Sequence, residues 1–219
     1  MSVTLGEEVM LLSLDDESGV AKDRASAGWA VAGGTLLELV VRDRVRVMSG
    51  RVSVTDASPT GDGLLDDRLH RLGEWVQRRR SAKVTDWLAK DQPTAVRATV
   101  RRLCERGLIV EEKHRTLGLF PVRRYPEADG SVERELRERL ARVVVQGARP
   151  DDRTSGLIAL LHGARLHGIA FPGIPRREVE PRMAAIAEGD WAADSVRRAI
   201  RDMQATMAAV TAATIAACT

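Results

Sequence analysis

Arg97 and Arg101 are the residues of this chain best suited to binding a ligand, because they lie four apart in a stretch with helical periodicity. Two guanidinium groups one helical turn apart can donate paired, charge-assisted hydrogen bonds to phosphate oxygens. We expect Arg24 to approach the same ligand from the N-terminal segment, and Trp29 to act as an anchor at a membrane interface. These four residues predict a site for an anionic lipid headgroup. A solvated helix face and a core tryptophan are the alternative interpretation.

Patterns typical of catalysis or metal binding are weak. His162 and His167 are five residues apart, whereas a zinc-binding pair on one helix face has a spacing of four. Asp62, Asp66 and Asp67 do not fit the spacing of a calcium loop, and favourable charge at a helix N-terminus explains them. We therefore expect a protein that is not an enzyme, with no catalytic residue, no metal site and no cofactor.

The composition predicts a folded, mainly helical protein. Of the 219 residues, 44% are hydrophobic but only 3% are aromatic, so the core must be built from aliphatic side chains, which favours packed helices. The length fits one domain of ordinary size. We expect a single globular helical domain over residues 1–219, with peripheral β-hairpins.

Charge and cysteine content restrict the location and the partners. The net charge is +3, so local patches rather than the whole surface must attract anions. Cys104 and Cys218 fit no close-spaced metal or redox motif, which indicates a reducing compartment without disulfides. The run 203–218 is shorter than a membrane span needs to be, and no signal-peptide pattern is seen. We expect a cytoplasmic protein, peripheral on the inner face of the membrane, and the Arg and Ala richness indicates a high-GC bacterial source.

Hydrophobic periodicity places the elements of the first third of the chain. Residues 5–14 predict a short buried helix or strand. Residues 30–47 predict a helix followed by a strand, with Val52 and Val54 in the return strand of a hairpin. Residues 62–80 predict an amphipathic helix.

The middle of the chain predicts two helices and a second hairpin. A short helix over 81–88 is expected to stop at a turn over 91–94, and the next helix to end at Gly107. Strands over 108–112 and 117–122 should form a hairpin, with its turn at 114–116. Further helices are expected over 132–145, 157–165, 179–187 and 194–217.

The second hairpin carries an apolar strand face made by Leu117, Leu119 and Phe120. This face could dip into lipid or pair with another copy of the chain. Covering the core of its own chain is the alternative interpretation.

Several short motifs follow one another along nearly the whole chain. They are Glu7-Glu8-Val9-Met10-Leu11-Leu12, Leu36-Leu37-Glu38-Leu39 with Arg42 and Arg44, Pro59-Thr60-Gly61-Asp62, Glu105-Arg106-Gly107-Leu108, and Asp151 and Arg153 with Leu157 to His162. In this order and spacing the chain resembles the Golgi phosphoprotein 3 family of phosphatidylinositol 4-phosphate-binding adaptors. The resemblance implies a mostly helical globule recruited to membranes through a phosphoinositide headgroup. It also implies binding of short protein tails, or self-association, through the hairpin after Gly107.

The resemblance does not extend to the headgroup pocket of the family. Eukaryotic members use a Trp and an Arg before the Leu36 motif, and two Arg residues three apart at the start of the helix that ends at Gly107. The corresponding positions here are Asp23 or Arg24, Ala32, Pro93 and Val96. Specificity for phosphatidylinositol 4-phosphate is therefore not carried over to this chain.

The function predicted from the sequence is that of a peripheral membrane adaptor. Its partners would be an anionic phospholipid or phosphoinositide headgroup, protein tails and a second copy of the chain. A winged helix-turn-helix that binds DNA is the alternative, because a short helix, a turn at Pro93, an Arg-bearing helix and a hairpin follow one another. Glu111, Glu112 and the low net charge oppose the phosphate attraction that DNA binding needs, so nucleic acid is not expected.

Overall fold

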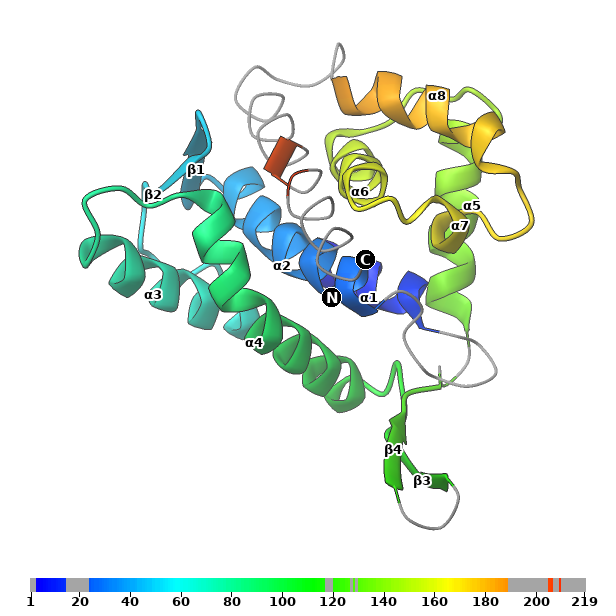
Figure 1. The fold of residues 1–219 in the computed structure, drawn as a ribbon, viewed down its shortest axis with the longest axis horizontal. Helices are drawn as coiled ribbons and strands as arrows, with labels where there is room; N and C mark the ends of the chain where they lie inside the picture. Colours follow the sequence, from blue (N-terminus) through cyan, green and yellow to red (C-terminus); the bar gives the residue numbers. More distant parts are fainter. Residues whose placement is uncertain are drawn as a thin grey trace.

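A computed structural model describes residues 3–14, 24–116, 120–126, 128, 130–188, 205, 206 and 209. Within these residues the fold is mainly helical, as predicted, with two small antiparallel hairpins (Figure 1). The elements in chain order are α1 (Leu5–Ser13), α2 (Arg24–Val41), β1 (Val45–Met48), β2 (Arg51–Val54), α3 (Gly63–Gln77), α4 (Val84–Glu105), β3 (Glu112–Thr116), β4 (Phe120–Arg124), α5 (Ser131–Val144), α6 (Asp152–Gly163), α7 (His167–Ala170) and α8 (Arg176–Glu188).

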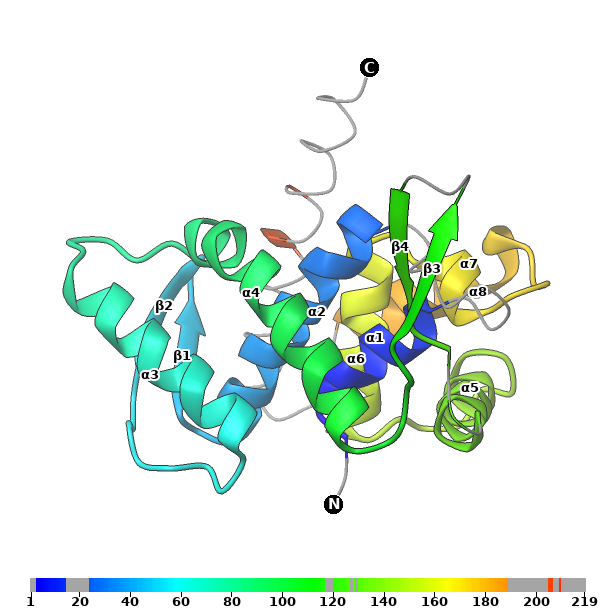
Figure 2. The same cartoon turned by 90° about the horizontal axis from the view of Figure 1, so that it is seen from below.

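Helix α1 lies in the middle of the molecule. It contacts α2 and α4 on one side and α5, α6 and α7 on the other (Figure 1, Figure 2). All nine of its residues are buried, which confirms the predicted buried segment as a helix. Thr4 and Glu7 form a capping box, so the first turn is closed by its own side chains although no water reaches it.

Two glycines allow α1 and α2 to approach closely. A Cβ atom built on Gly34 would lie 2.9 Å from the backbone nitrogen of Gly6 and 3.0 Å from the carbonyl carbon of Leu5. Both of these atoms belong to backbone that cannot move aside. The short distance between α1 and α2 therefore depends on the absence of a side chain at Gly34.

The predicted first hairpin is confirmed. Strands β1 and β2 pair with Val45 opposite Val54 and Met48 opposite Arg51. Ser49 and Gly50 form the two-residue turn, both with positive φ, as in the turns that match the twist of a hairpin. The hairpin packs beside the C-terminal end of α2 and against α3.

The predicted turn at 91–94 is wrong, because α4 is one helix that runs through Pro93. Proline removes one backbone N–H and would normally end or kink a helix. Here buried side chains continue at helical spacing on both sides of it, including Leu88, Ala95, Thr99 and Leu103. Packing of this continuous stripe outweighs the lost hydrogen bond.

The predicted cap at Gly107 is confirmed. Its φ is 68°, and its N–H donates to the carbonyl of Cys104 at 2.9 Å, while the N–H of Leu108 donates to Leu103 at 3.0 Å. A left-handed residue at this position is favoured as glycine because no Cβ clashes with the preceding turn.

The second hairpin starts later than predicted. Residues 114–116, expected in the turn, belong to strand β3, whose Thr116 pairs with Phe120 of β4. Residues 108–110 already pair with the returning chain, because the N–H of Val110 donates to the Pro126 carbonyl at 2.9 Å and the N–H of Ala128 to the Leu108 carbonyl at 3.0 Å, but the regular strand β3 begins only at Glu112. Leu117 and Leu119 lie outside the described residues.

The predicted helices of the last third are confirmed as α5, α6 and α8. The expected closing helix over 194–217 lies almost wholly outside the described residues. Cys104 is a free thiol, and Cys218 is likewise outside the described part. No described helix is both long and apolar enough to cross a lipid bilayer.

Candidate functional site

The helical period of α4 divides its arginines between two surfaces. Arg97 and Arg101, one turn apart, are both exposed. Arg97 Nε donates to the Pro93 carbonyl at 3.1 Å, and Arg101 Nε lies 3.6 Å from the carboxylate of Glu105. Arg102 is turned by about 100° around the helix axis and faces α1 and α3 instead. The predicted pair therefore presents its guanidinium groups to solvent.

Arg102 pairs with Asp62, the residue that caps α3. Its Nη2 donates to Oδ2 at 2.7 Å and its Nη1 donates to Oδ1, which also accepts the N–H groups of Leu64 and Leu65. Burial alone would raise the pKa of Asp62, but the hydrogen bonds from Arg102 and Leu65 outweigh it and hold this pKa below its ordinary value. Asp62 is thus an ionised cap that joins α3 to α4.

Three glutamates, Glu7, Glu8 and Glu38, are at most 3% exposed. Each is paired with two arginines. The pairs are Glu7 with Arg102 and Arg106, Glu8 with Arg139 and Arg153, and Glu38 with Arg42 and Arg153. We call these eight residues, together with Asp62, the internal ion-pair network. An unpaired charge buried this deeply would cost several kcal/mol of folding free energy. The network therefore holds helices together, and we do not take it for a ligand-binding site.

A cavity of about 550 Å³ opens beside this network, along the C-terminal half of α4. Its charged lining consists of Arg42, Arg101, Arg102, Arg106, Asp62, Asp67 and Glu105. Acidic side chains and arginines are mixed in this lining. Arg42 and Arg102 already form ion pairs with the buried carboxylates of Glu38 and Glu7. Arg101 is the lining arginine whose acidic partner is exposed, so it is the one best able to turn toward an anion.

The structure describes the other predicted site residues only in part. Trp29 lies on α2, half-buried, and packs against the hydrophobic core. Arg24 is the first residue of α2 and Phe120 the first of β4, but their side chains are outside the described part of the structure. Leu117 and Leu119 are also outside it, so the apolar hairpin face stays a prediction.

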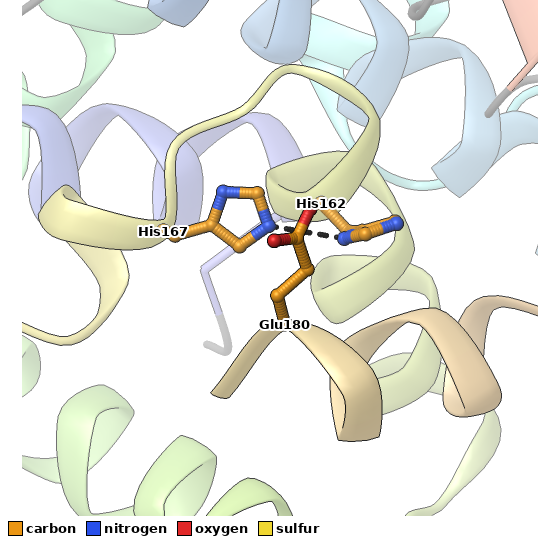
Figure 3. A group of neighbouring side chains, drawn as sticks. All are labelled: His162, His167 and Glu180. Carbon is orange, nitrogen blue, oxygen red and sulfur yellow. Dashed lines mark hydrogen bonds between the residues drawn. The ribbon is translucent and has the colours of Figure 1, made fainter. Parts of the chain in front are cut away.

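His162, His167 and Glu180 form a cluster that the sequence spacing did not suggest (Figure 3). Nδ1 of His162 lies 3.0 Å from Nε2 of His167. The two rings do not share a helix. His162 is in the last turn of α6 and His167 begins α7, so the chain reverses between them and the argument from helical spacing does not apply.

The family model for Golgi phosphoprotein 3 (GPP34) matches residues 5–203. The chain belongs to this family. Membership confirms the resemblance drawn from the sequence motifs, and it agrees with the mainly helical fold.

The structure gives those family-like motifs a physical role. Glu7, Glu8, Glu38, Arg106 and Arg153 all belong to the internal ion-pair network. The sequence analysis used these residues only as marks of resemblance. A signal was nevertheless present, because each glutamate interrupts or flanks an apolar run and a charge in such a run is buried only when it is paired. The Golgi phosphoprotein 3 motifs of this chain thus maintain the scaffold.

Proposed function

We propose that this chain is a peripheral membrane adaptor without catalytic activity that binds an anionic lipid headgroup through the exposed face of α4. The observation that carries the proposal is the solvent exposure of Arg97 and Arg101. The internal ion-pair network engages Arg102 of the same helix and Arg106, which follows its last residue, but leaves Arg97 and Arg101 for an external anion. Membership in the Golgi phosphoprotein 3 family supports the adaptor class.

The start of α2 packs against α4 at Gln92. A Cβ atom built on Gly28 would lie 2.2 Å from Nε2 of Gln92, so the two helices touch there. Arg97 and Arg101 follow Gln92 by five and nine residues, which turns them by about 140° and 180° around the helix axis. Trp29 follows Gly28 directly and is partly exposed. Arg24 lies four residues, or about one helical turn, before Gly28. The contribution of Arg24 and Trp29 to the surface is therefore proposed from their residue types, a guanidinium donor and an interfacial anchor, and not from this contact.

Binding through such a surface is weak and depends on salt. Each basic residue close to an anionic membrane contributes about 1 kcal/mol, so removing two lowers the partition constant by roughly 30-fold. The attraction falls off within a Debye length of about 8 Å at physiological ionic strength.

Protein tails or a second copy of the chain are proposed to bind at the β3–β4 hairpin. The hairpin extends away from the body of the molecule (Figure 1). Its strands therefore have little of their own chain to cover, which favours an external partner. The DNA-binding alternative is not favoured, because the continuous helix α4 leaves no turn at Pro93 for a helix-turn-helix.

Sedimentation with phosphatidylserine or phosphatidylinositol 4-phosphate vesicles tests the proposal. We expect wild-type protein to sediment with both at low salt and much less at high salt. The R97A/R101A variant should lose binding, while R78A/R80A, which removes the same charge from exposed positions after α3, should keep it.

Failure of the wild-type protein to sediment with any anionic vesicle would reject lipid binding. Equal loss in R97A/R101A and R78A/R80A would show that net charge, rather than the α4 surface, drives attachment. A preference for phosphatidylinositol 4-phosphate over phosphatidylserine at equal vesicle charge would show headgroup specificity that the sequence does not predict.

A further inference from the structure

The cluster of His162, His167 and Glu180 is built on three consecutive helices. After α6 the chain turns at Arg165, which has a left-handed backbone with φ of 59°. The N–H of Arg165 donates to the carbonyl of His162 at 3.0 Å, and the N–H of Leu166 donates to Leu161 at 2.8 Å. This closed turn carries His167 back over the end of α6. Glu180 reaches the two rings from α8 (Figure 3).

The distances suit a small metal ion. One ligand atom from each of the three residues lies within 4.8 Å of the others. Two nitrogens bound to a tetrahedral zinc ion at about 2.0 to 2.1 Å would be roughly 3.3 to 3.4 Å apart. Nδ1 of His162 and Nε2 of His167, now 3.0 Å apart, need to separate by only a few tenths of an ångström.

The charge states also suit a metal ion. Each imidazole in its neutral form offers the lone pair of one ring nitrogen to a metal ion. The carboxylate of Glu180, which pairs with Arg176, offers an oxygen ligand. Two neutral imidazoles and one carboxylate form a donor set found in zinc proteins, and they leave one coordination position for water.

The ordinary alternative is a hydrogen bond between the rings with a separate surface ion pair. Arg176 and Glu180 form that ion pair, and their side chains are 52% and 37% exposed. Such pairs contribute at most about 1 kcal/mol, so a metal ion can displace Arg176 at little cost. His167, by contrast, is 2% exposed and is fixed in place by its surroundings.

We propose that His162, His167 and Glu180 bind one divalent transition-metal ion, with zinc as the ion that fits these donors best. Imidazole and carboxylate donors also accept Co²⁺, Ni²⁺ and Cu²⁺, so the site is identified by its residues and not by its selectivity. The bound ion would join α6, α7 and α8. This site is separate from the α4 surface and does not depend on the proposed adaptor function.

Calorimetric titration of metal-stripped protein with Zn²⁺ tests the proposal, with Co²⁺ absorption as a second measurement. We expect one equivalent bound to the wild type. H162A and E180Q should each weaken binding at least tenfold, since even the loss of a residue that supports a ligand costs 10- to 100-fold. H70A/H114A removes the other two of the four histidines and should bind like the wild type. R176A should bind as tightly or more tightly, because Glu180 loses its competitor.

Circular dichroism shows whether each variant is folded, and His167 is left intact because its side chain is buried and its loss could unfold the protein. Absence of stoichiometric zinc binding by the wild type would overturn the proposal. So would wild-type affinity in H162A or E180Q, or a loss of binding in H70A/H114A. A tetrahedral Co²⁺ spectrum in the wild type that disappears in H162A would support it.

Discussion

Nη1 of Arg153 lies 2.8 Å from Oε2 of Glu38, although 115 residues separate them in the sequence. The same guanidinium group donates from Nε to Glu8 at 3.1 Å. One arginine of α6 thus neutralises a buried acid on α1 and another on α2. The central helices are joined by charge as well as by apolar packing.

Glu8→Gln should lower the free energy of unfolding by about 1 to 3 kcal/mol. The substitution keeps the shape but leaves Arg139 without its buried counter-charge and Arg153 with Glu38 alone. Breaking a fully buried ion pair costs roughly 3 to 5 kcal/mol. We expect only about 1 to 3 kcal/mol here because both arginines are partly exposed to water. Urea unfolding measures the change. Glu74→Gln, at an exposed position on α3, should change it by less than about 0.5 kcal/mol.

Gly34→Ala should destabilise the protein by roughly 1 to 3 kcal/mol, because the new methyl group meets backbone of α1 at 2.9 Å. Gly73→Ala is the matched control. It lies within α3 with nothing within 4 Å, so alanine should stabilise that helix by about 1 kcal/mol. Equal effects of the two substitutions would show that α1 and α2 are not in close contact.

Asp62→Asn should lower stability at neutral pH and have little effect in strong acid. The folded-state pKa of Asp62 lies below its value in the unfolded chain, so the stabilisation is fully present above about pH 4. It is lost as the pH falls through the lower, folded-state pKa. Asparagine still caps α3, so the variant isolates the ion pair with Arg102. Unfolding curves at a series of pH values should converge for wild type and variant, and parallel curves would contradict the ion pair.

Pro93→Ala should raise the free energy of unfolding by roughly 1 to 3 kcal/mol, because it restores the backbone hydrogen bond missing from the middle of α4. Thr94→Ala, the adjacent control, should gain no more than about 0.7 kcal/mol from helix propensity. A loss of stability in Pro93→Ala would indicate that the helix is broken at 91–94, as the sequence predicts.

The sequence predicts most elements correctly because their signals are local. The glycine at position 107 indicates the end of a helix from its immediate neighbours alone. The apolar run after Glu8 indicates a buried segment but leaves helix and strand open, and the structure shows a helix. Pro93 is misjudged for the opposite reason, since a proline stops a helix only when tertiary packing does not hold both halves in line. That packing comes from α2 and α1, which lie far away in the sequence.

The candidate sites were predictable only where they depend on one helix. Spacing alone correctly places Arg97 and Arg101 on one exposed face of α4. The proximity of His162 to His167 depends on a chain reversal at Arg165, a residue type that rarely adopts a left-handed backbone. Glu180 joins them from another helix, and no sequence spacing encodes that contact.

The position of α1 at the centre of the ion-pair network has a consequence for synthesis. Glu8 leaves the ribosome 145 residues before Arg153, which is roughly 7 to 30 seconds at 5 to 20 residues per second. Arg139, its other partner, is made 14 residues before Arg153, so for most of that interval the carboxylate has neither partner and stays hydrated. The nascent chain can therefore bury this carboxylate in its ion pairs only after both arginines have emerged, however early the helix itself has formed.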